Sequence, residues 1–213
     1  PVSRTVTVTL PPSTLYLTAL VHRLDRISRS SCGTPRTTTG APPSVTVTRF
    51  CSASGKSDLA EGMVCRLPGP RLYIATMQAF DDECRARIAR HRARRAGKGF
   101  STVESPLAAQ LAGVPAGANA LLECLSNLVA NEMYDPAGQG SEAALAGVLA
   151  LAARCPHLTV VTNEVFSGGA DYEGDTLSYL RALAGINRAL AAQADRVAEV
   201  VCGLPNWLKG GPA

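Results

Sequence analysis

A short polar loop from Phe50 to Ser57 ends in Ser-Gly-Lys-Ser and separates an apolar run from a helical pattern. The phosphate-binding P-loop has the pattern G-x-x-x-x-G-K-[ST], and Gly55, Lys56 and Ser57 match its last three positions. In such a loop, backbone N–H groups cradle phosphates, the lysine reaches the β- and γ-phosphates and the hydroxyl ligates Mg²⁺. Phe50 stands where the pattern has its first glycine. The alternative is a chance S-G-K-S that opens a helix, but the strand before it favours the phosphate loop.

A second group with chemical potential is His91 and the arginines around it. Arg87 lies four residues before it, and Arg94 and Arg95 lie three and four residues after it, so all four share one helical face. Neighbouring cations disfavour the charged imidazolium and leave a neutral ring able to attack phosphorus. The arginines could hold the phosphates that are attacked and released. The alternative is a solvent-facing basic helix on which the histidine has no role.

Polar residues follow two apolar strand-like runs. Glu123 ends the first run, where a carboxylate can organise Mg²⁺, although it could also lie at the start of the next helix with a local role. Asn163 and Glu164 follow the second run in the same way, which predicts that they face the site.

The pattern of the chain from Ser44 onward predicts the elements that position these groups. Strands are expected at Val45–Phe50, Arg71–Thr76, Ala120–Leu125, Leu158–Thr162 and Val197–Cys202. Helices are expected at Ser57–Leu67, Asp82–Arg95, Ser141–Arg154 and Thr176–Ala194. This alternation predicts an α/β fold with a mainly parallel sheet and helices on both faces. Ligands of such folds bind at the carboxyl ends of the strands.

Charge and composition divide the chain at about residue 43. Residues 1–49 carry six arginines against Asp25 alone, so the remainder of the +4 chain carries −1, which disfavours a nucleic-acid partner. Residues 1–43 are rich in Ser, Thr, Pro and Arg. We expect a disordered basic extension or, as the alternative, a transit-type peptide, and a single catalytic domain over 44–213.

The seven cysteines show no C-x-x-C spacing and are odd in number. They favour free thiols in a reducing cytoplasm over a disulfide framework or a zinc site. Charges interrupt every apolar run before about 18 residues, so the sequence predicts no membrane span.

Several blocks of the sequence resemble the bifunctional adenosylcobinamide kinase/adenosylcobinamide-phosphate guanylyltransferase family of cobalamin biosynthesis. They are YIATMQAFDDECRARIARH with Arg95 and T-V-E after it, LLECLSNLVAN, VVTNEV, N-x-x-L-A-x-x-A-D-x-V and VVCGLPNWLKG. The resemblance covers roughly Val45 to Gly210, in the family's order and near its spacing.

The resemblance implies a P-loop NTPase (RecA-like) fold and two reactions at linked sites. ATP or GTP phosphorylates adenosylcobinamide; GTP then guanylylates His91, and GMP passes to adenosylcobinamide phosphate to give adenosylcobinamide-GDP. Catalysis would rest on His91 and Lys56, Mg²⁺ on Ser57 and Glu123, and the assembly would be a homo-oligomer resembling a trimer. The implied nucleotide contacts are Phe50, Cys51, Ser52, Ala53, Ser54, Gly55, Lys56, Ser57, Ala75, Thr76, Met77, Arg92, Ala93, Arg94, Arg95, Glu104 and Glu123.

Some positions depart from the family pattern. Phe50 and Cys51 replace two glycines, Ala96 replaces a proline, and Phe100 stands near a tryptophan position. One alternative is therefore a member with guanylyltransferase activity alone. Others are a non-catalytic nucleotide-binding protein and a P-loop small-molecule kinase in which His91 has no part.

Overall fold

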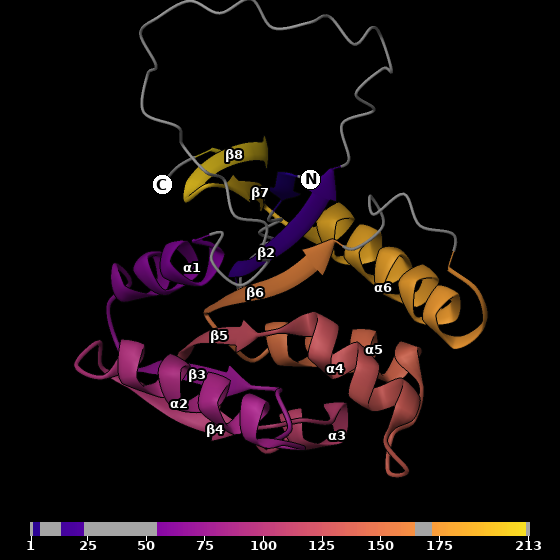
Figure 1. Ribbon diagram of the computed structural model, residues 1–213. Coiled ribbons are helices and arrows are strands. Elements are labelled where there is room, and N and C mark those ends of the chain that lie inside the picture. Colours follow the sequence, from indigo (N-terminus) through magenta and orange to yellow (C-terminus); the bar gives the residue numbers. More distant parts are fainter. Residues whose placement is uncertain (1, 5–13, 24–54, 165–171, 212–213) are drawn as a thin grey trace, which may run out of the picture.

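A computed structural model describes residues 2–4, 14–23, 55–164 and 172–211, which form a single sheet flanked by helices (Figure 1). The strands are β1 (Val2–Arg4), β2 (Thr14–Arg23), β3 (Arg71–Ala75), β4 (Phe100–Glu104), β5 (Asn119–Glu123), β6 (His157–Glu164), β7 (Arg196–Val201) and β8 (Leu204–Lys209). The helices of the described ranges are α1 (Lys56–Cys65), α2 (Asp82–Arg95), α3 (Ala108–Leu111), α4 (Leu125–Tyr134), α5 (Ser141–Ala152) and α6 (Gly174–Gln193).

The sheet is mainly parallel, as predicted. Its strand order is β4-β3-β5-β6-β2-β7-β8, with β1 added beside β2. Neighbours from β4 to β7 run parallel, and only the β7–β8 and β1–β2 pairs within the described strands are antiparallel. The carboxyl ends of β3, β5 and β6 therefore meet at one edge of the sheet, where the sequence predicts the site.

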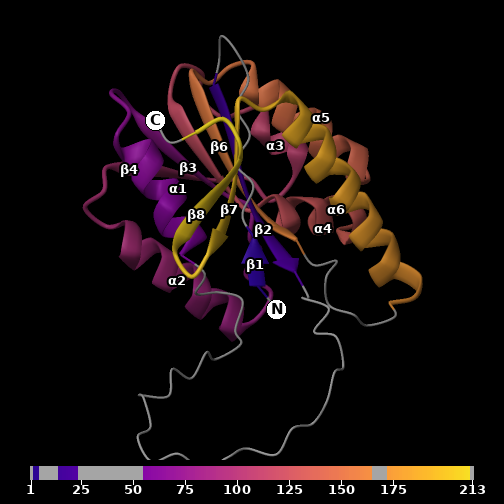
Figure 2. The same ribbon diagram turned by 90° about the horizontal axis from the view of Figure 1, so that it is seen from above.

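Alternate residues of the central strands supply two separate apolar layers. Leu122 of β5 packs with α3, α4, α5 and α6, whereas Leu121 packs with Ala60 and Val64 of α1. Each of the two leucines is fully buried and contributes about 2 kcal/mol by that burial. Figure 2 shows the result, with α1 and α2 on one face of the sheet and α3 to α6 on the other.

The predicted elements that fall within the described residues are confirmed, with small shifts at their ends. The helix predicted at Asp82–Arg95 has those bounds, and Asp81 caps it by accepting from Cys84 N at 2.7 Å. The strand predicted to end at Cys202 ends at Val201 instead. Cys202 and Gly203 both have positive φ and make the two-residue turn into β8. The strand predicted at Val45–Phe50 lies outside the described residues.

Two edge strands, β4 and β8, were not predicted. Edge strands are solvated along most of their length, so they lack the apolar run by which a strand is recognised. All of β8 except the half-buried Trp207 is exposed, and it contains Pro205, which an edge position tolerates.

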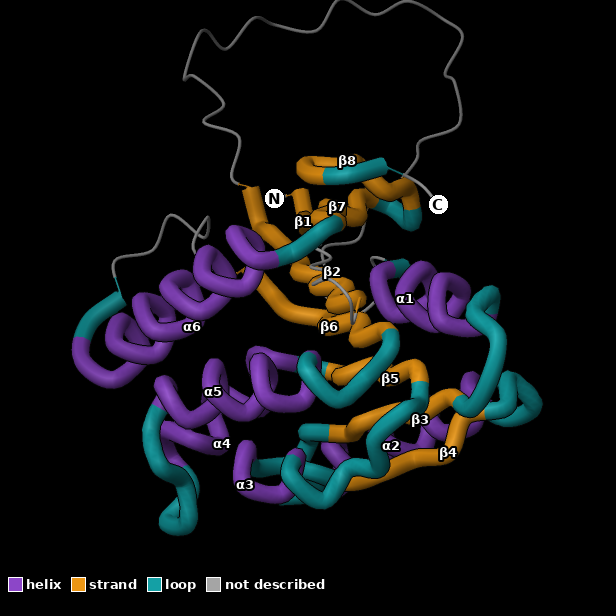
Figure 3. Tube along the Cα trace, turned by 180° about the vertical axis from the view of Figure 1, so that it is seen from behind, coloured by secondary structure: helices purple, strands orange, loops and turns teal. Residues whose placement is uncertain are grey.

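The structure differs from the prediction for residues 1–43 at Val2–Arg4, which forms β1, and over Thr14–Arg23. The second segment forms β2, an interior strand in which Leu17 lies opposite Val160 of β6 and Val197 of β7 (Figure 3). The Ser-, Thr- and Pro-rich flanks suggested an extension, but the apolar stretch from Leu15 is long enough for a strand. Interior parallel strands favour such nearly continuous apolar runs because both of their faces are covered. Residues 5–13 and 24–43 lie outside the described residues.

Candidate functional site

The start of α1 places the end of the predicted phosphate loop at the carboxyl ends of β5 and β6. Gly55 precedes α1 with a φ of 79°, and a Cβ there would lie 2.7 Å from the Cα of Gly203. Glycine is therefore required by both the backbone conformation and the close approach of the β7–β8 turn. The first N–H groups of α1 have no partner within the helix and are suited to an anion. Residues 50–54 of the loop lie outside the described residues.

Glu123 is the centre of the site. Ser57 Oγ donates a hydrogen bond to Glu123 Oε1, and His91 Nδ1 lies 3.9 Å from that same oxygen. The Glu123 side chain is 9% exposed and the His91 side chain 26%, so both are largely shielded but His91 is still accessible. The sheet thus brings together a P-loop serine, a carboxylate and a histidine from three separate segments of the chain.

The oxygen ligands at this point suit a hard divalent cation. Glu123 Oε2 is buried and finds no hydrogen-bond partner among the described residues, while Oε1 faces the Ser57 hydroxyl. Mg²⁺ is bound in proteins by one or two oxygen side chains together with substrate phosphates. A hydroxyl beside a carboxylate with a spare buried oxygen has the donor chemistry that such an ion needs.

Lys56 is held by a chain of amide and hydroxyl groups. Its Nζ donates to Asn163 Oδ1 at 2.6 Å, and Asn163 Nδ2 donates to Ser126 Oγ at 2.7 Å. Behind them, Asn187 Nδ2 of α6 donates to Asn163 O at 3.2 Å. An amide fixed at both ends gives the lysine an acceptor of defined position, which reduces the freedom of a long side chain.

Asn163→Ala is expected to raise the Kd for GTP about tenfold. The change removes the acceptor of fixed position to which the charged Lys56 ammonium donates a hydrogen bond. Isothermal calorimetry would measure the Kd, and thermal unfolding would check the fold. Gln193→Ala, an exposed amide at the far end of α6, is the matched control. Equal GTP affinity in Asn163→Ala and parent would show that Asn163 does not position the lysine.

The arginines of α2 are engaged with groups on three neighbouring elements. Arg94 contacts both carboxylate oxygens of Asp58 at 2.5 Å, and Arg92 pairs with Glu104 of β4. The Arg95 guanidinium lies 3.3 Å from the ring centroid of Tyr73. Burial, followed by the neighbouring Glu123 carboxylate, raises the pKa of the Tyr73 phenol, so the ring stays neutral beneath the cation.

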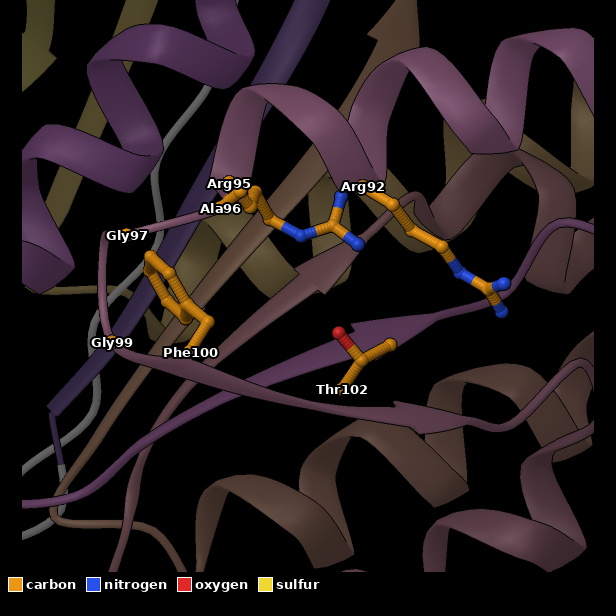
Figure 4. Close-up of a pocket in the computed structure, with 7 residues that line it drawn as sticks. All are labelled: Arg92, Arg95, Ala96, Gly97, Gly99, Phe100 and Thr102. Carbon is orange, nitrogen blue, oxygen red and sulfur yellow. The ribbon is translucent and has the colours of Figure 1, made fainter.

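A cavity of about 390 Å³ lies between the end of α2 and β4. Its lining residues are Arg92, Arg95, Ala96, Gly97, Gly99, Phe100 and Thr102. Figure 4 shows the Arg92 and Arg95 side chains extending from α2 over the strands, with Phe100 and Thr102 on the strand below. Two guanidinium groups beside an aromatic ring could hold an anionic ligand with a flat ring.

The residues that follow β3 shape the same edge of the sheet. Thr76 Oγ1 donates to Cys124 O at 2.7 Å and accepts from Cys124 N at 2.8 Å. Ala75 O accepts from Ser105 N, and Met77 is half-buried beside them. These contacts hold the ends of β3, β4 and β5 together beside Glu123.

The structure brings together Lys56, Ser57, His91 and Glu123, all of which the sequence singled out. Arg92 and Glu104 also meet, whereas Ala93 is exposed on α2 without a contact that defines a role. Sequence reasoning identified Asn163 but not its function, and it missed Ser126 and Tyr73. The available signal for Ser126 was its position, three residues after Glu123 and so close to the carboxyl end of the same strand.

No helix in the described part of the chain is both long enough and apolar enough to cross a membrane.

Comparison with known proteins identifies the family. A family model described as cobinamide kinase / cobinamide phosphate guanyltransferase matches residues 51–208. The chain is 33% identical over 163 residues to the bifunctional adenosylcobalamin biosynthesis protein CobP of Pseudomonas aeruginosa, covering 75% of this chain and 94% of that protein.

Two further relatives carry a similar name. The bifunctional adenosylcobalamin biosynthesis proteins CobU of Escherichia coli and Salmonella typhimurium are 35% and 34% identical over 169 and 171 residues. In both comparisons the match covers 71% of this chain and 92% of the relative. The α/β fold and the matched blocks around Lys56, His91 and Glu123 agree with these similarities. This chain belongs to the cobinamide kinase / cobinamide phosphate guanyltransferase family.

Proposed function

We propose that this chain carries out two successive reactions on adenosylcobinamide, first as a kinase and then as a guanylyltransferase. The observation that carries this proposal is the shared oxygen of Glu123, which contacts Ser57 of the phosphate loop and faces His91. We further propose that a triphosphate whose β- and γ-phosphates bind at Lys56 presents its α-phosphate to His91. One nucleotide-binding centre can therefore support both reactions.

In the kinase step, the aminopropanol hydroxyl oxygen of adenosylcobinamide attacks the γ-phosphorus of ATP or GTP. A P–O bond forms, the bond to the bridging oxygen of the β-phosphate breaks, and the nucleoside diphosphate leaves while the hydroxyl proton passes to water. Lys56 balances the charge on the β- and γ-phosphates, and Ser57 and Glu123 would hold Mg²⁺. When bound, Mg²⁺ neutralises negative charge on the phosphate oxygens.

In the guanylyl step, the Nε2 atom of His91 attacks the α-phosphorus of GTP. A P–N bond forms, the α–β bridging bond breaks and pyrophosphate leaves. A phosphate oxygen of adenosylcobinamide phosphate then attacks the same phosphorus, so that the P–N bond breaks and adenosylcobinamide-GDP is released. The Nδ1 side of the ring faces Glu123, which would accept the Nδ1–H and keep the Nε2 lone pair available.

The ion pairs of α2 support a role of its arginines in binding phosphates. Arg92 and Arg94 each pair with an exposed carboxylate, Glu104 and Asp58, and such solvated pairs contribute little to stability. Phosphate oxygens can replace these partners at small cost. We therefore propose that the residues from Arg92 to Arg95 contact the nucleotide, together with Ala75, Thr76 and Met77 and the acids Glu104 and Glu123.

The experiment that tests both reactions is incubation of the full chain with labelled nucleotides and Mg²⁺. α-Labelled GTP should label the protein, and adenosylcobinamide phosphate should then remove the label as adenosylcobinamide-GDP. γ-Labelled ATP or GTP should transfer its label to adenosylcobinamide. Guanylyl transfer without phosphoryl transfer would indicate a family member that has lost the kinase activity through the changes at Phe50 and Cys51. Neither label moving would indicate a nucleotide-binding protein without catalysis.

Lys56→Ala is expected to weaken binding of GTP and ATP by about 10- to 100-fold, because the β- and γ-phosphates lose a charge-assisted partner. Calorimetric titration would measure the effect. Lys209→Ala removes a lysine that instead donates to Ala191 O and Ala192 O at the end of α6, and it should bind nucleotide as the parent does. If Lys56→Ala binds GTP as tightly as the parent, the loop does not hold the triphosphate.

The trimeric assembly and the cytoplasmic location remain predictions. The five cysteines that fall within the described residues are free thiols.

A further inference from the structure

Three exposed aromatic side chains follow the three strands that end at the reaction centre. Phe80 lies between β3 and α2, Tyr134 ends α4 after β5, and Tyr172 lies between β6 and α6. They are 75%, 52% and 40% exposed, and we call them the aromatic rim. Because β3, β5 and β6 are consecutive neighbours in the sheet, the segments that follow them all start at the same carboxyl edge. In Figure 1, α6 begins on the side to which the arrowheads of β5 and β6 point.

Two hydrogen bonds tie these connections to one another. Gln78 Nε2 donates to Asp135 Oδ2 at 2.9 Å, which links the β3–α2 connection to the end of α4. Tyr134 Oη donates to Asp175 O at 2.7 Å, which links the end of α4 to the start of α6. The three segments that carry the rim are therefore linked to one another by hydrogen bonds.

The rim lies near the phosphate-transfer centre. Tyr179, one helical turn beyond Asp175, donates to Ser126 O at 3.1 Å. Ser126 Oγ in turn accepts from Asn163, which holds Lys56. The rim is therefore linked to the lysine through Tyr179, Ser126 and Asn163. A bound molecule could extend along this path with one end on the rim and the other at the phosphates.

The charge of the rim differs from that of the nucleotide site. The described connections at 76–83, 135–140 and 172–175 contain no lysine or arginine. Their carboxylates are Asp81, Asp82, Glu83, Asp135, Glu173 and Asp175. Asp82 pairs with Arg85 of the same helix, while Asp135 accepts from Gln78. Negative potential at these carboxylates attracts a cationic ligand or one rich in N–H donors.

Gln78 has a further property that suits a ligand with donor groups. Its Oε1 is buried and has no hydrogen-bond partner among the described residues, although its Nε2 is satisfied by Asp135. A buried acceptor without a partner costs free energy that a ligand N–H could recover. This acceptor lies on the same connection as Phe80.

We propose that the aromatic rim binds the corrin macrocycle of adenosylcobinamide, with its aminopropanol arm directed to Lys56 and His91. This proposal rests on the proposed function. It names the surface that would bind the corrinoid substrate, as distinct from the nucleotide. A corrin ring is a broad, largely apolar plate whose arms end in carboxamides, and with alkylated cobalt(III) it carries net positive charge. Aromatic side chains suit the plate, the carboxylates suit the amide N–H groups, and the sign of the charge is complementary.

The test compares binding of adenosylcobinamide with labelling by GTP in matched variants. Phe80→Ala/Tyr172→Ala removes two rim side chains for which no hydrogen bond or ion pair among the described residues is recorded. It should raise the Kd for adenosylcobinamide, measured by equilibrium dialysis, by about tenfold. Labelling of the protein by α-labelled GTP needs no corrinoid and should keep the parent rate.

Leu208→Ala is the matched control, because it removes an exposed apolar side chain from β8 beside the start of β7, at the opposite edge of the sheet. It should bind adenosylcobinamide as the parent does. Unchanged corrinoid affinity in the rim variant, or an equal loss in the β8 variant, would overturn the proposal while GTP labelling leaves the proposed function intact. A parent that neither binds adenosylcobinamide nor takes up label would overturn both.

Discussion

Replacing His91 with alanine is expected to abolish guanylyl transfer, by at least about a thousandfold, and to leave phosphorylation of adenosylcobinamide within about twofold of the parent. The histidine supplies the nitrogen that bonds to the α-phosphorus, and its Nδ1 atom lies 3.9 Å from Glu123 Oε1. Phosphoryl transfer to a hydroxyl depends on the phosphate loop and Mg²⁺ and needs no histidine nucleophile. Alanine is well tolerated at a helical position, so α2 should remain folded.

The measurement is acid-labile, base-stable labelling of the protein by α-labelled GTP in parent and His91→Ala. His157→Ala changes a histidine at the amino end of β6, at the opposite edge of the sheet, and should label as the parent does. A parent without label, or a His91→Ala protein that takes up as much label as the parent, would show that this histidine is not the nucleophile.

Glu123→Ala is expected to reduce both reactions by about 100- to 1000-fold, in contrast to the selective effect at His91. Its Oε1 accepts from Ser57 and faces His91, so one change removes a proposed Mg²⁺ oxygen and the group that orients the imidazole. Steady-state rates for each half-reaction would be measured with γ- and α-labelled nucleotide over a range of Mg²⁺ concentrations. Raising Mg²⁺ should recover part of the kinase rate but little of the guanylyl rate, since added metal cannot reorient the histidine.

Glu142→Gln, an exposed acid in the first turn of α5, is the control for the general loss of a carboxylate. A kinase rate unchanged in Glu123→Ala would mean that the carboxylate serves the histidine alone. An unchanged guanylyl rate would mean that the 3.9 Å contact with His91 has no catalytic consequence.

Candidate site residues could be singled out from the sequence where chemistry and position coincide in a short segment. Lys56 and Ser57 open a helix, Glu123 ends an apolar strand, and both features are visible without a structure. The arginines near His91 were also placed on one helix, but their partners could not be predicted. The ion pair of Arg94 with Asp58 and the stacking of Arg95 on Tyr73 depend on how α2 lies against α1 and β3.

The sequence by itself determined the alternation of strands and helices, the bounds of α2 and the residue types at the carboxyl ends of β5 and β6. These features follow from periodicity and capping, which act between residues a few positions apart. Only the tertiary structure decided that Ser57 and His91 meet at one oxygen of Glu123, and that Thr14–Arg23 lies between β6 and β7. Those outcomes depend on strand order and register, and contacts between residues far apart in the chain leave no local pattern from which they could be read.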